Sequence, residues 1–224
     1  MYPVWPITVP AEERTKRFDF YLPVDRMNLF VMYEREADTT MADRIMDHAQ
    51  LLVQTVGYNG FSYADIAQEL GIRKATIHYY FRTKASLCTA LLRRYRRRFR
   101  EKVGNGTELV ASPRARLDLY ISFYQQALED GRLCPCGVLT GELVSLEPEI
   151  RDQIRGFFEE QIAWVEAQLI QARQHGELLC GHNAHQLAAS IFGMIEGGML
   201  LARAADDTGI LADAIRGSLA LVFA

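Results

Sequence analysis

Residues 57–87 read GYNGFSYADIAQELGIRKATIHYYFRTKASL, and this stretch decides the fold. A short helix is predicted to begin at Ser62, because Ser62-Tyr63-Ala64-Asp65 has the spacing of a capping box. Gly71 supplies a tight turn, and a second short helix is expected over residues 72–81. The apolar residues available to lock these two helices together are Ile66, Ala67, Leu70, Ile72, Ile77 and Phe81. Two helices joined by a glycine turn, with a helix before them, predict a helix-turn-helix.

The helix before this unit is predicted from its own capping box. Thr40 and Asp43 repeat the spacing, and apolar residues then recur at steps of three and four between Ile45 and Val56. Gly57 ends the pattern. We therefore expect a three-helix unit whose last two members form the helix-turn-helix.

Residues 1–40 differ from the rest of the chain. They contain Pro3, Pro6, Pro10 and Pro23 and sustain no helical period. We therefore expect a poorly ordered N-terminal tail. A second interpretation is that translation starts later, and the candidate start residues are Met27, Met32 and Met41.

A fourth helix is expected to begin after Thr83 and to run to about Val103. One of its faces is apolar, and the other carries six arginines: Arg93, Arg94, Arg96, Arg97, Arg98 and Arg100. These arginines are either further phosphate contacts or a face that is solvated or ion-paired with the second half, and for the later ones we favour the second interpretation. Gly104-Asn105-Gly106 then breaks the helical pattern. The predicted domain boundary separates residues 41–104 from residues 105–224.

The second half of the chain is also helical in pattern. Pro113 and Pro148 each begin a segment with an apolar helical face, and a proline at the first position of a helix leaves no extra donor unpaired. A short segment is expected over residues 137–146, Asn183 caps another helix, and Gly209 precedes the last one. No strand run or repeat appears, so the predicted fold class is all-α with about nine helices.

The composition excludes several classes of protein. Hydrophobic residues make up 49% of the 224 residues and charged residues 24%, which is typical of a globular chain and excludes disorder throughout. The longest apolar stretch, residues 187–202, is interrupted by Glu196 and is short for a membrane span. No secretory signal is recognisable, so four cysteines indicate a reducing cytoplasm.

The net charge of −3 conceals a division along the chain. Residues 41–104 carry 12 Lys or Arg and 5 Asp or Glu, a balance of +7. Residues 105–224 carry 8 and 16, a balance of −8, and residues 1–40 have a balance of −2. This division indicates that only the helix-turn-helix half meets a polyanion.

The second short helix of the helix-turn-helix offers groups that suit a DNA groove. With the apolar residues turned inward, hydroxyls, an imidazole and cations remain for phosphates and base edges. The residues free to face outward are Arg73, Lys74, Thr76, His78, Tyr79 and Tyr80. A packing unit that binds no nucleic acid is the alternative, and the agreement of motif and local charge disfavours it.

This segment resembles the DNA-binding domain of TetR/AcrR-type transcriptional regulators between Thr40 and Leu92. The residues that carry the resemblance are Ser62 or Tyr63, Ile66-Ala67, Gly71, Tyr79-Tyr80-Phe81, Lys84 and Leu87. His78 departs from the pattern, since the family commonly has Tyr there. The resemblance implies nine helices, a homodimer, a divergent effector domain, and DNA contacts from Ser62, Tyr63, Arg73, Lys74, Ala75, Thr76, His78, Tyr79, Tyr80, Thr83 and Lys84.

Residues 132–178 resemble a subgroup of these regulators. In that subgroup a Cys-x-Cys-Gly-x-Leu run is followed by a Leu-Pro-like turn and a long helix, and Cys134 and Pro148 lie at matching places here. The resemblance implies an effector pocket without naming the effector. The candidate lining residues are Tyr120, Phe123, Tyr124, Cys134, Cys136, Leu139, Phe158, Trp164 and Met194. An aromatic stripe at helical spacing is also typical of an ordinary core.

Cys134 and Cys136 admit three interpretations. Small apolar packing groups are the one we favour. A thiol switch that senses oxidants or electrophiles is the second. A metal site is the third, with Cys180, His182 and His185 as further ligands. We expect no metal, no cofactor and no disulfide within the Cys-x-Cys pair, whose spacing is poor for an unstrained bridge.

The last two helices are the candidate dimer interface, because glycines let helices approach closely. The residues assigned to it are Ile191, Met194, Gly198, Leu201, Leu211, Ile215 and Leu219. Burial of these residues within one chain is the alternative. Glu196 lies inside the apolar helix and needs a partner, which is a cationic ligand, an arginine or a polar edge of the dimer.

The sequence therefore predicts a cytoplasmic, dimeric repressor with no membrane partner. Residues 41–104 would bind a palindromic double-stranded operator, and residues 105–224 would dimerise and bind an unknown small-molecule effector that releases the DNA. The first alternative is a repressor that switches through Cys134 or Cys136. The second is an enzyme that uses the C-terminal pocket, and no Ser-His-Asp, paired-carboxylate or phosphate-loop arrangement supports it.

Overall fold

The computed structural model describes residues 40–178, 181 and 183–223, and residues 40–224 form one compact unit. The predicted N-terminal tail up to residue 39 lies outside the described residues, as do Cys180 and His182 of the metal interpretation.

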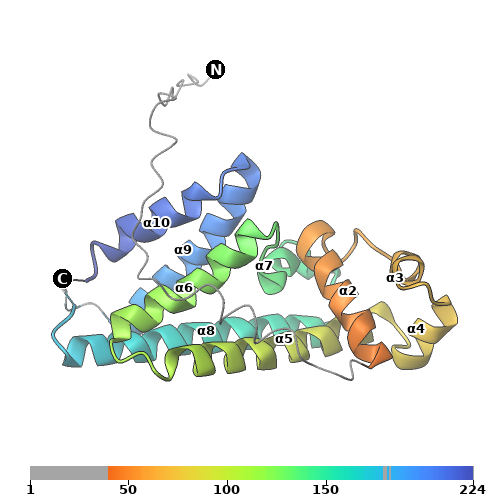
Figure 1. Ribbon diagram of the computed structural model, residues 1–224, viewed down its shortest axis with the longest axis horizontal. Coiled ribbons are helices and arrows are strands. Elements are labelled where there is room, and N and C mark those ends of the chain that lie inside the picture. Colours follow the sequence, from red (N-terminus) through yellow and green to blue (C-terminus); the bar gives the residue numbers. More distant parts are fainter. Residues whose placement is uncertain (1–39, 179–180, 182, 224) are drawn as a thin grey trace, which may run out of the picture. The chain divides into compact units, whose positions relative to one another are not determined.

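Helices build the whole of the described chain (Figure 1). They are α2 (Met41–Val56), α3 (Tyr63–Leu70), α4 (Lys74–Tyr80), α5 (Lys84–Thr107), α6 (Pro113–Glu129), α7 (Pro135–Thr140), the 3-10 turn η2 (Leu143–Ser145), α8 (Pro148–Gln174), α9 (Ala184–Ala205) and α10 (Gly209–Leu219). One isolated β-bridge pairs Leu178 with Phe223. The prediction of an all-α fold with about nine helices is confirmed for these residues.

The helix starts follow from capping side chains, as predicted. The Thr40 side chain accepts the Asp43 N–H, and Ser62 Oγ accepts the Ala64 N–H while the Asp65 carboxylate accepts the Ser62 N–H. Thr83 caps α5 in the same manner. Gly71 follows α3 with φ 64° and ψ 32°, the left-handed conformation that glycine adopts without steric cost.

The prediction that Gly104-Asn105-Gly106 ends a helix is wrong, because α5 continues through these residues to Thr107. Val103 and Thr107 are both buried on its inner face. A Cβ at Gly106 would lie 3.2 Å from the Phe123 ring, so the glycine allows α6 to pack closely. These tertiary contacts outweigh the roughly 1 kcal/mol that each helical glycine costs.

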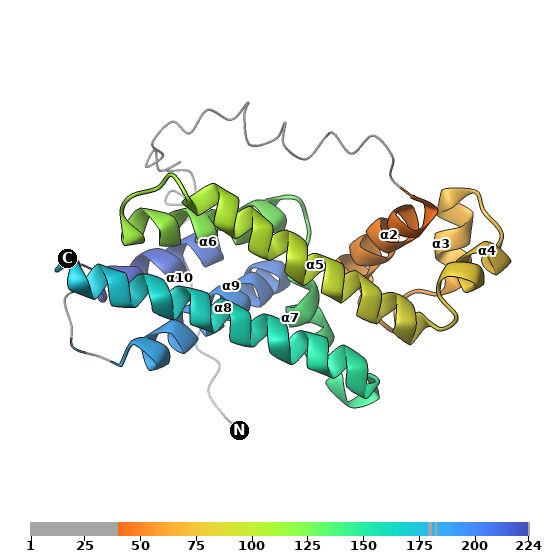
Figure 2. The ribbon, with the colours of Figure 1, turned by 90° about the horizontal axis from the view of Figure 1, so that it is seen from below.

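One helix is common to the two halves of this unit. Figures 1 and 2 show α2, α3 and α4 clustered around the N-terminal end of α5, while α6 and α8 lie beside the rest of it. α9 packs on α8 and α10, and α7 packs between α2 and α8. The predicted helix-turn-helix and the predicted effector domain therefore share α5 as a structural element.

The assignment of the dimer interface needs correction. Five of the seven assigned residues are buried within the chain, where they pack α9, α8 and α10 together: Ile191, Gly198, Leu211, Ile215 and Leu219. A Cβ at Gly198 would lie 2.7 Å from Leu211 Cδ1, so the glycine serves a close approach inside one chain. Leu201 is 61% exposed and Met194 is half-buried.

α9 is the one described helix that is long and apolar enough to cross a membrane by length and composition. Only 39% of its most apolar 18-residue window is buried within the chain. Its outward side carries Gly193, Leu200 and Leu201, all of them exposed. This apolar outer side is a surface that a partner can cover.

Candidate DNA-binding surface and effector core

The helix-turn-helix is held together by a small apolar core. Ile66 and Ile77 are completely buried between α3 and α4, and Phe81 is buried directly after α4. The Tyr63 hydroxyl donates to the Phe81 main-chain oxygen at 3.0 Å. Tyr63 is therefore buried, and the prediction that it contacts DNA needs correction: its side chain ties the start of α3 to the end of α4.

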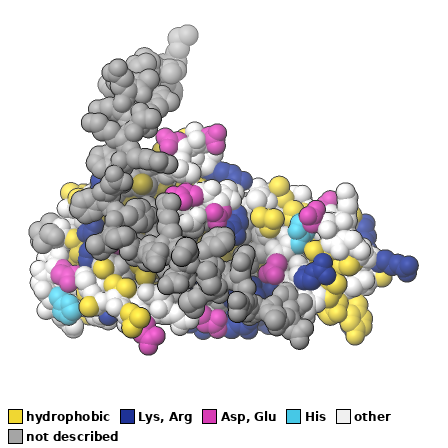
Figure 3. Space-filling view, viewed as in Figure 1, with side chains coloured by type: hydrophobic (Ala, Val, Ile, Leu, Met, Phe, Trp, Pro, Cys, Tyr) yellow, Lys and Arg dark blue, Asp and Glu magenta, His cyan; other side chains and the backbone are white. Residues whose placement is uncertain are grey.

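The outer side of α4 carries most of the other candidate DNA-binding residues. Tyr79 is 82% exposed and Tyr80 43% exposed, and their rings meet edge to face with centroids 5.1 Å apart. The remaining exposed candidates here are Arg73, Lys74, Ala75 and His78, while Thr76 is half-buried. Figure 3 shows Lys or Arg side chains beside apolar ones at the end of the molecule that carries α3 and α4. Cations and aromatic hydroxyls thus share one exposed surface.

Three candidate residues have local structural partners as well. Ser62 and Thr83 are exposed, but their hydroxyls accept main-chain N–H groups at the starts of α3 and α5. His78 packs edge-on against Tyr63 with ring centroids 4.9 Å apart, and its Nδ1 lies 3.3 Å from the Arg82 main-chain oxygen. His78 is therefore exposed, but the Tyr63 ring and the Arg82 main-chain oxygen orient its imidazole.

Lys84 points away from the expected phosphate contact. Its ammonium donates to the main-chain oxygens of Tyr58 and Phe61 and lies over both of their rings, 4.6 Å and 4.0 Å from the centroids. Partial burial lowers the pKa of Lys84. In this structure Lys84 stabilises the turn between α2 and α3, because its ammonium makes hydrogen bonds to two main-chain oxygens and cation–π contacts with two rings.

The same turn is held from the other side by the second half of the chain. The Glu142 carboxylate, in the turn after α7, accepts the main-chain N–H groups of Tyr58 at 2.8 Å and Asn59 at 2.9 Å. Gly57 has φ 81°, and a Cβ there would overlap the Glu142 carboxylate. Sequence patterns could not identify Glu142, because its partners lie more than 80 residues away.

Two further contacts tie α2 to the second half. Gln54 is buried and donates to the Leu133 main-chain oxygen at 2.8 Å. Arg203, at the end of α9, donates to the main-chain oxygens of Thr55 and Gly131. α2 and the turn after it therefore move together with α7 and α9 or lose these bonds.

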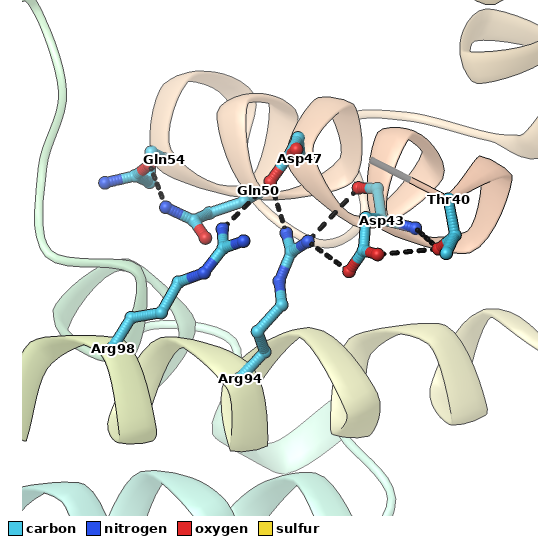
Figure 4. A network of polar contacts seen from close by, with 7 residues as sticks. All are labelled: Thr40, Asp43, Asp47, Gln50, Gln54, Arg94 and Arg98. Carbon is cyan, nitrogen blue, oxygen red and sulfur yellow. Dashed lines mark hydrogen bonds and ion pairs between the residues drawn. The ribbon is translucent and has the colours of Figure 1, made fainter. Parts of the chain in front are cut away.

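The arginine face of α5 is largely engaged in ion pairs. Arg94 is buried and pairs with Asp43 at 3.3 Å and Asp47 at 2.6 Å, both on α2, and Arg98 also reaches Asp47 (Figure 4). A hydrogen bond from Thr40, then those from Arg94, keep the pKa of Asp43 below its ordinary value. Arg94 and Arg98 are therefore ion-paired, but their acidic partners lie on α2 and not in the second half of the chain.

Arg96 and Arg100 pair with the second half, as predicted. Both reach Glu160 on α8, with Arg96 at 2.6 Å and Arg100 at 3.0 Å. A Cβ at Gly156 would lie 2.6 Å from the Arg96 guanidinium, so this glycine lets the arginine cross the α8 surface. These two arginines join α5 to α8.

Most of the aromatic candidates for the effector pocket form one packed cluster. Tyr120 stacks on Trp164 with centroids 4.8 Å apart and meets Tyr124 at 5.2 Å. Phe158 meets Phe192 of α9 at 5.6 Å. Phe123 lies apart, with the Lys102 ammonium 4.2 Å from its ring centroid.

Two surface hollows among the described residues lie away from this cluster. One is lined by Arg44, Asp47, His48, Leu51 and Leu70, and the other by Leu128, Gly131, Ala202, Arg203, Asp206, Asp207 and Thr208. The pocket stays a prediction.

Cys134 and Cys136 lie at the start of α7, and Cys88 lies on α5. Cys134, Cys136 and Cys88 are buried free thiols. Burial raises the pKa of the Cys134 thiol, and it raises the pKa of Cys88 to about 12. Among the described residues no group of three metal-ligating side chains is found, and the remaining member of the metal interpretation, His185, pairs with Glu166 at 2.9 Å. The raised pKa values of the buried Cys134 and Cys88 thiols fit the packing interpretation.

Family models match both halves of the chain. Residues 45–91 match "Bacterial regulatory proteins, tetR family", and residues 113–218 match "Tetracyclin repressor-like, C-terminal domain". The first match includes α3 and α4, and the second covers α6 to α10 almost completely.

Individual relatives agree with these matches. A crystal structure of a TetR-family transcriptional regulator from Agrobacterium tumefaciens is 30% identical, covers 82% of this chain and 97% of its own, and superposes with a TM-score of 0.78. An HTH-type transcriptional regulator of Lactococcus lactis subsp. lactis is 26% identical over 175 residues, 75% of this chain and 86% of that protein. The biofilm operon negative transcriptional regulator IcaR of Staphylococcus aureus (strain Newman) is 40% identical over 47 residues, 21% of this chain and 25% of that protein. The helix-turn-helix, the shared long helix and these matches agree, and the chain belongs to the TetR family of transcriptional regulators.

Proposed function

We propose that this chain is a homodimeric repressor that binds a palindromic double-stranded operator and releases it when an effector binds the second half. The observation that carries the proposal is the division of side chains on α4: Ile77 is completely buried, while Tyr79 is 82% exposed beside exposed Arg73 and Lys74. A helix with this surface fits the major groove, where cations meet phosphates and hydroxyls meet base edges.

The outer side of α9 supports the dimer. Gly193, Leu200 and Leu201 are exposed, and a Cβ at Gly193 or Gly197 would meet nothing within 4 Å. Small residues beside leucines let a second helix approach closely. A second copy of the chain that covers this side would bring two α4 helices to successive major grooves of a two-fold symmetric site.

The contacts around α2 support release by an effector. Glu142, Leu133 and Arg203 belong to the second half, and each is hydrogen-bonded to α2 or to the turn after it. A ligand that shifts α7 or α9 must therefore move α2 or break these bonds. Contacts that differ between the ligand-free and the ligand-bound state are what couples an effector site to a DNA-binding site.

A reversible ligand accounts for the second half better than the thiol switch or an enzyme does. Reactive cysteines are exposed and have a lowered pKa, whereas Cys134 is buried and its pKa is raised. The aromatic residues of the core supply shape and packing. None of the hydrogen bonds described among them forms a nucleophile–base pair.

The test is a fluorescence-anisotropy titration with DNA from beside the gene, at several salt concentrations. Lys74→Ala should weaken binding to operator and random DNA alike and reduce the salt slope by about one phosphate per subunit. Thr76→Ala should cost specificity, on the order of 1–3 kcal/mol at one base pair of each half-site. Glu159→Gln on α8, which is exposed, is the control. A wild-type protein that does not distinguish operator from random DNA would overturn the proposal.

A further inference from the structure

One buried carboxylate oxygen in the second half has no hydrogen-bond partner among the described residues, although the Cys134 thiol hydrogen-bonds to the same side chain. Glu196 projects from α9, and its Oε1 atom is buried and has no hydrogen-bond partner among the described residues. Its Oε2 atom lies so close to Gly137 of α7 that a Cβ there would overlap it. A buried carboxylate normally has a cation or several donors around it, so the free oxygen calls for an explanation.

Among the described residues, the charged and titratable groups that interact with Glu196 include no cation. Those whose pKa responds to the Glu196 charge are Tyr95 on α5, Tyr120 and Tyr124 on α6, and Cys134 before α7. Burial is the main cause of the raised pKa of each of these groups, and the negative charge of Glu196 adds to it. In the part of the chain that the structure describes, neither an arginine nor a lysine is found to compensate the carboxylate, so the arginine partner considered from the sequence is not found there.

Aromatic rings dominate the same region. Tyr120 stacks on Trp164 at 4.8 Å, Tyr124 meets Phe192 at 6.4 Å, and Phe192 lies one turn before Glu196 on α9. Ring faces attract cations, and a carboxylate beside them adds a full negative charge. A protonated amine has what this place lacks, namely a positive charge and N–H donors on an apolar body.

We propose that the position beside Glu196 Oε1 binds the ammonium group of a small organic amine, whose apolar part packs among the aromatic residues of α6 and α8. That this amine is the effector rests on the proposed function. The binding itself does not. The ammonium donates to Oε1, and the aromatic side chains enclose the rest of the molecule. Because Glu196 of α9 lies against Gly137 of α7, the amine would also lie next to the elements that hold α2 through Glu142 and Arg203.

The proposal predicts how binding depends on pH. Burial raises the pKa of Glu196 to about 7, so without a cation the carboxyl group is partly protonated near neutrality. An ammonium ion binds the ionised form, so its affinity should rise about tenfold between pH 6 and pH 8 and level off above that. The tyrosines and Cys134 stay neutral in this range because their pKa values are raised.

The experiment is isothermal titration calorimetry of the full chain with benzylamine and with benzyl alcohol, its uncharged isostere. At pH 8 the wild type should bind benzylamine at least about tenfold more tightly than benzyl alcohol. Glu196→Gln should remove this preference, because the amide keeps the shape and loses the charge. Glu159→Gln changes the net charge equally at an exposed position of α8 and should keep the preference.

Several results would overturn the site. The first is equal binding of amine and alcohol, and the second is a preference that survives in Glu196→Gln. The third is a wild-type affinity for benzylamine that does not change between pH 6 and pH 8, and the fourth is no binding of benzylamine. The pH series needs no variant, so it decides the question even if Glu196→Gln fails to fold. Operator binding is measured separately without amine. Loss of operator binding alone counts against the proposed function and leaves the amine site standing.

Discussion

The carboxylate of Glu142 accepts the main-chain N–H of Tyr58 at 2.8 Å, which joins the turn after α7 to the turn after α2. We expect Glu142→Ala to lower the free energy of unfolding by about 1–3 kcal/mol, because it leaves the Tyr58 and Asn59 N–H groups without their acceptor. Glu142→Gln keeps one acceptor oxygen and should cost less. Urea unfolding measures both, with Glu159→Ala as the exposed control. A Glu142→Ala midpoint equal to that of the wild type would contradict the assignment.

Gly198 should not tolerate a side chain. In Gly198→Ala the new Cβ would lie 2.7 Å from Leu211 Cδ1, so either the buried Leu211 side chain must repack or α9 and α10 must separate, at a cost of about 1–3 kcal/mol. Gly104→Ala is the matched control, since this helical glycine has nothing within 4 Å and alanine there should stabilise α5 by roughly 0.5–1 kcal/mol. Thermal unfolding of the two variants should shift in opposite directions. Equal shifts would mean that α9 and α10 do not pack as described.

Lys84 and Lys74 should separate stability from DNA binding. Lys84→Met removes the donor to the Tyr58 and Phe61 main-chain oxygens, so unfolding should become easier by about 1–3 kcal/mol. The salt slope of DNA binding should stay that of the wild type. Lys74→Ala should do the reverse, because Lys74 is exposed on α4. A reduced salt slope in Lys84→Met would show that this ammonium leaves the turn and reaches a phosphate.

Glu196 should make the protein less stable as the pH rises. Its pKa is raised from 4.5 to about 7 by burial, so the folded state holds a proton that the unfolded state has lost between these values. This contribution is fully present below about pH 4.5 and is lost by about pH 7, a change on the order of 3 kcal/mol. Urea unfolding between pH 5 and pH 8 should show the decrease in the wild type and a weaker one in Glu196→Gln. The same slope in both proteins would place the carboxylate in contact with water.

Local patterns predicted the helices well because their ends depend on neighbouring residues. Thr40, Ser62, Thr83 and Asn183 cap helices that begin where the sequence placed them. The prediction failed at Gly104–Gly106, where the glycine pattern is outweighed by the burial of residues on the inner face of α5. Such burial depends on α6 and α8, and a sequence pattern does not show it.

The candidate site was predictable in its location and less so in its details. Arg73, Lys74 and Tyr79 do face outward, because inward positions follow from the helical period. The period could not show that Tyr63 bonds to the Phe81 carbonyl or that Lys84 turns toward two carbonyls. These are tertiary contacts of single polar atoms, and the same holds for the isolation of Glu196.

α5 is one continuous helix that connects the two halves of the chain. Its 24 residues extend over about 36 Å, and its two ends belong to different structural neighbourhoods. A tilt of about 5° moves the far end by roughly 3 Å, so in a two-fold dimer the two recognition helices would separate by roughly 6 Å. That distance approaches two base-pair steps of about 3.4 Å each. In the proposed dimer, a small ligand would therefore need to favour only a slight rotation of one helix to put both halves out of phase with the DNA.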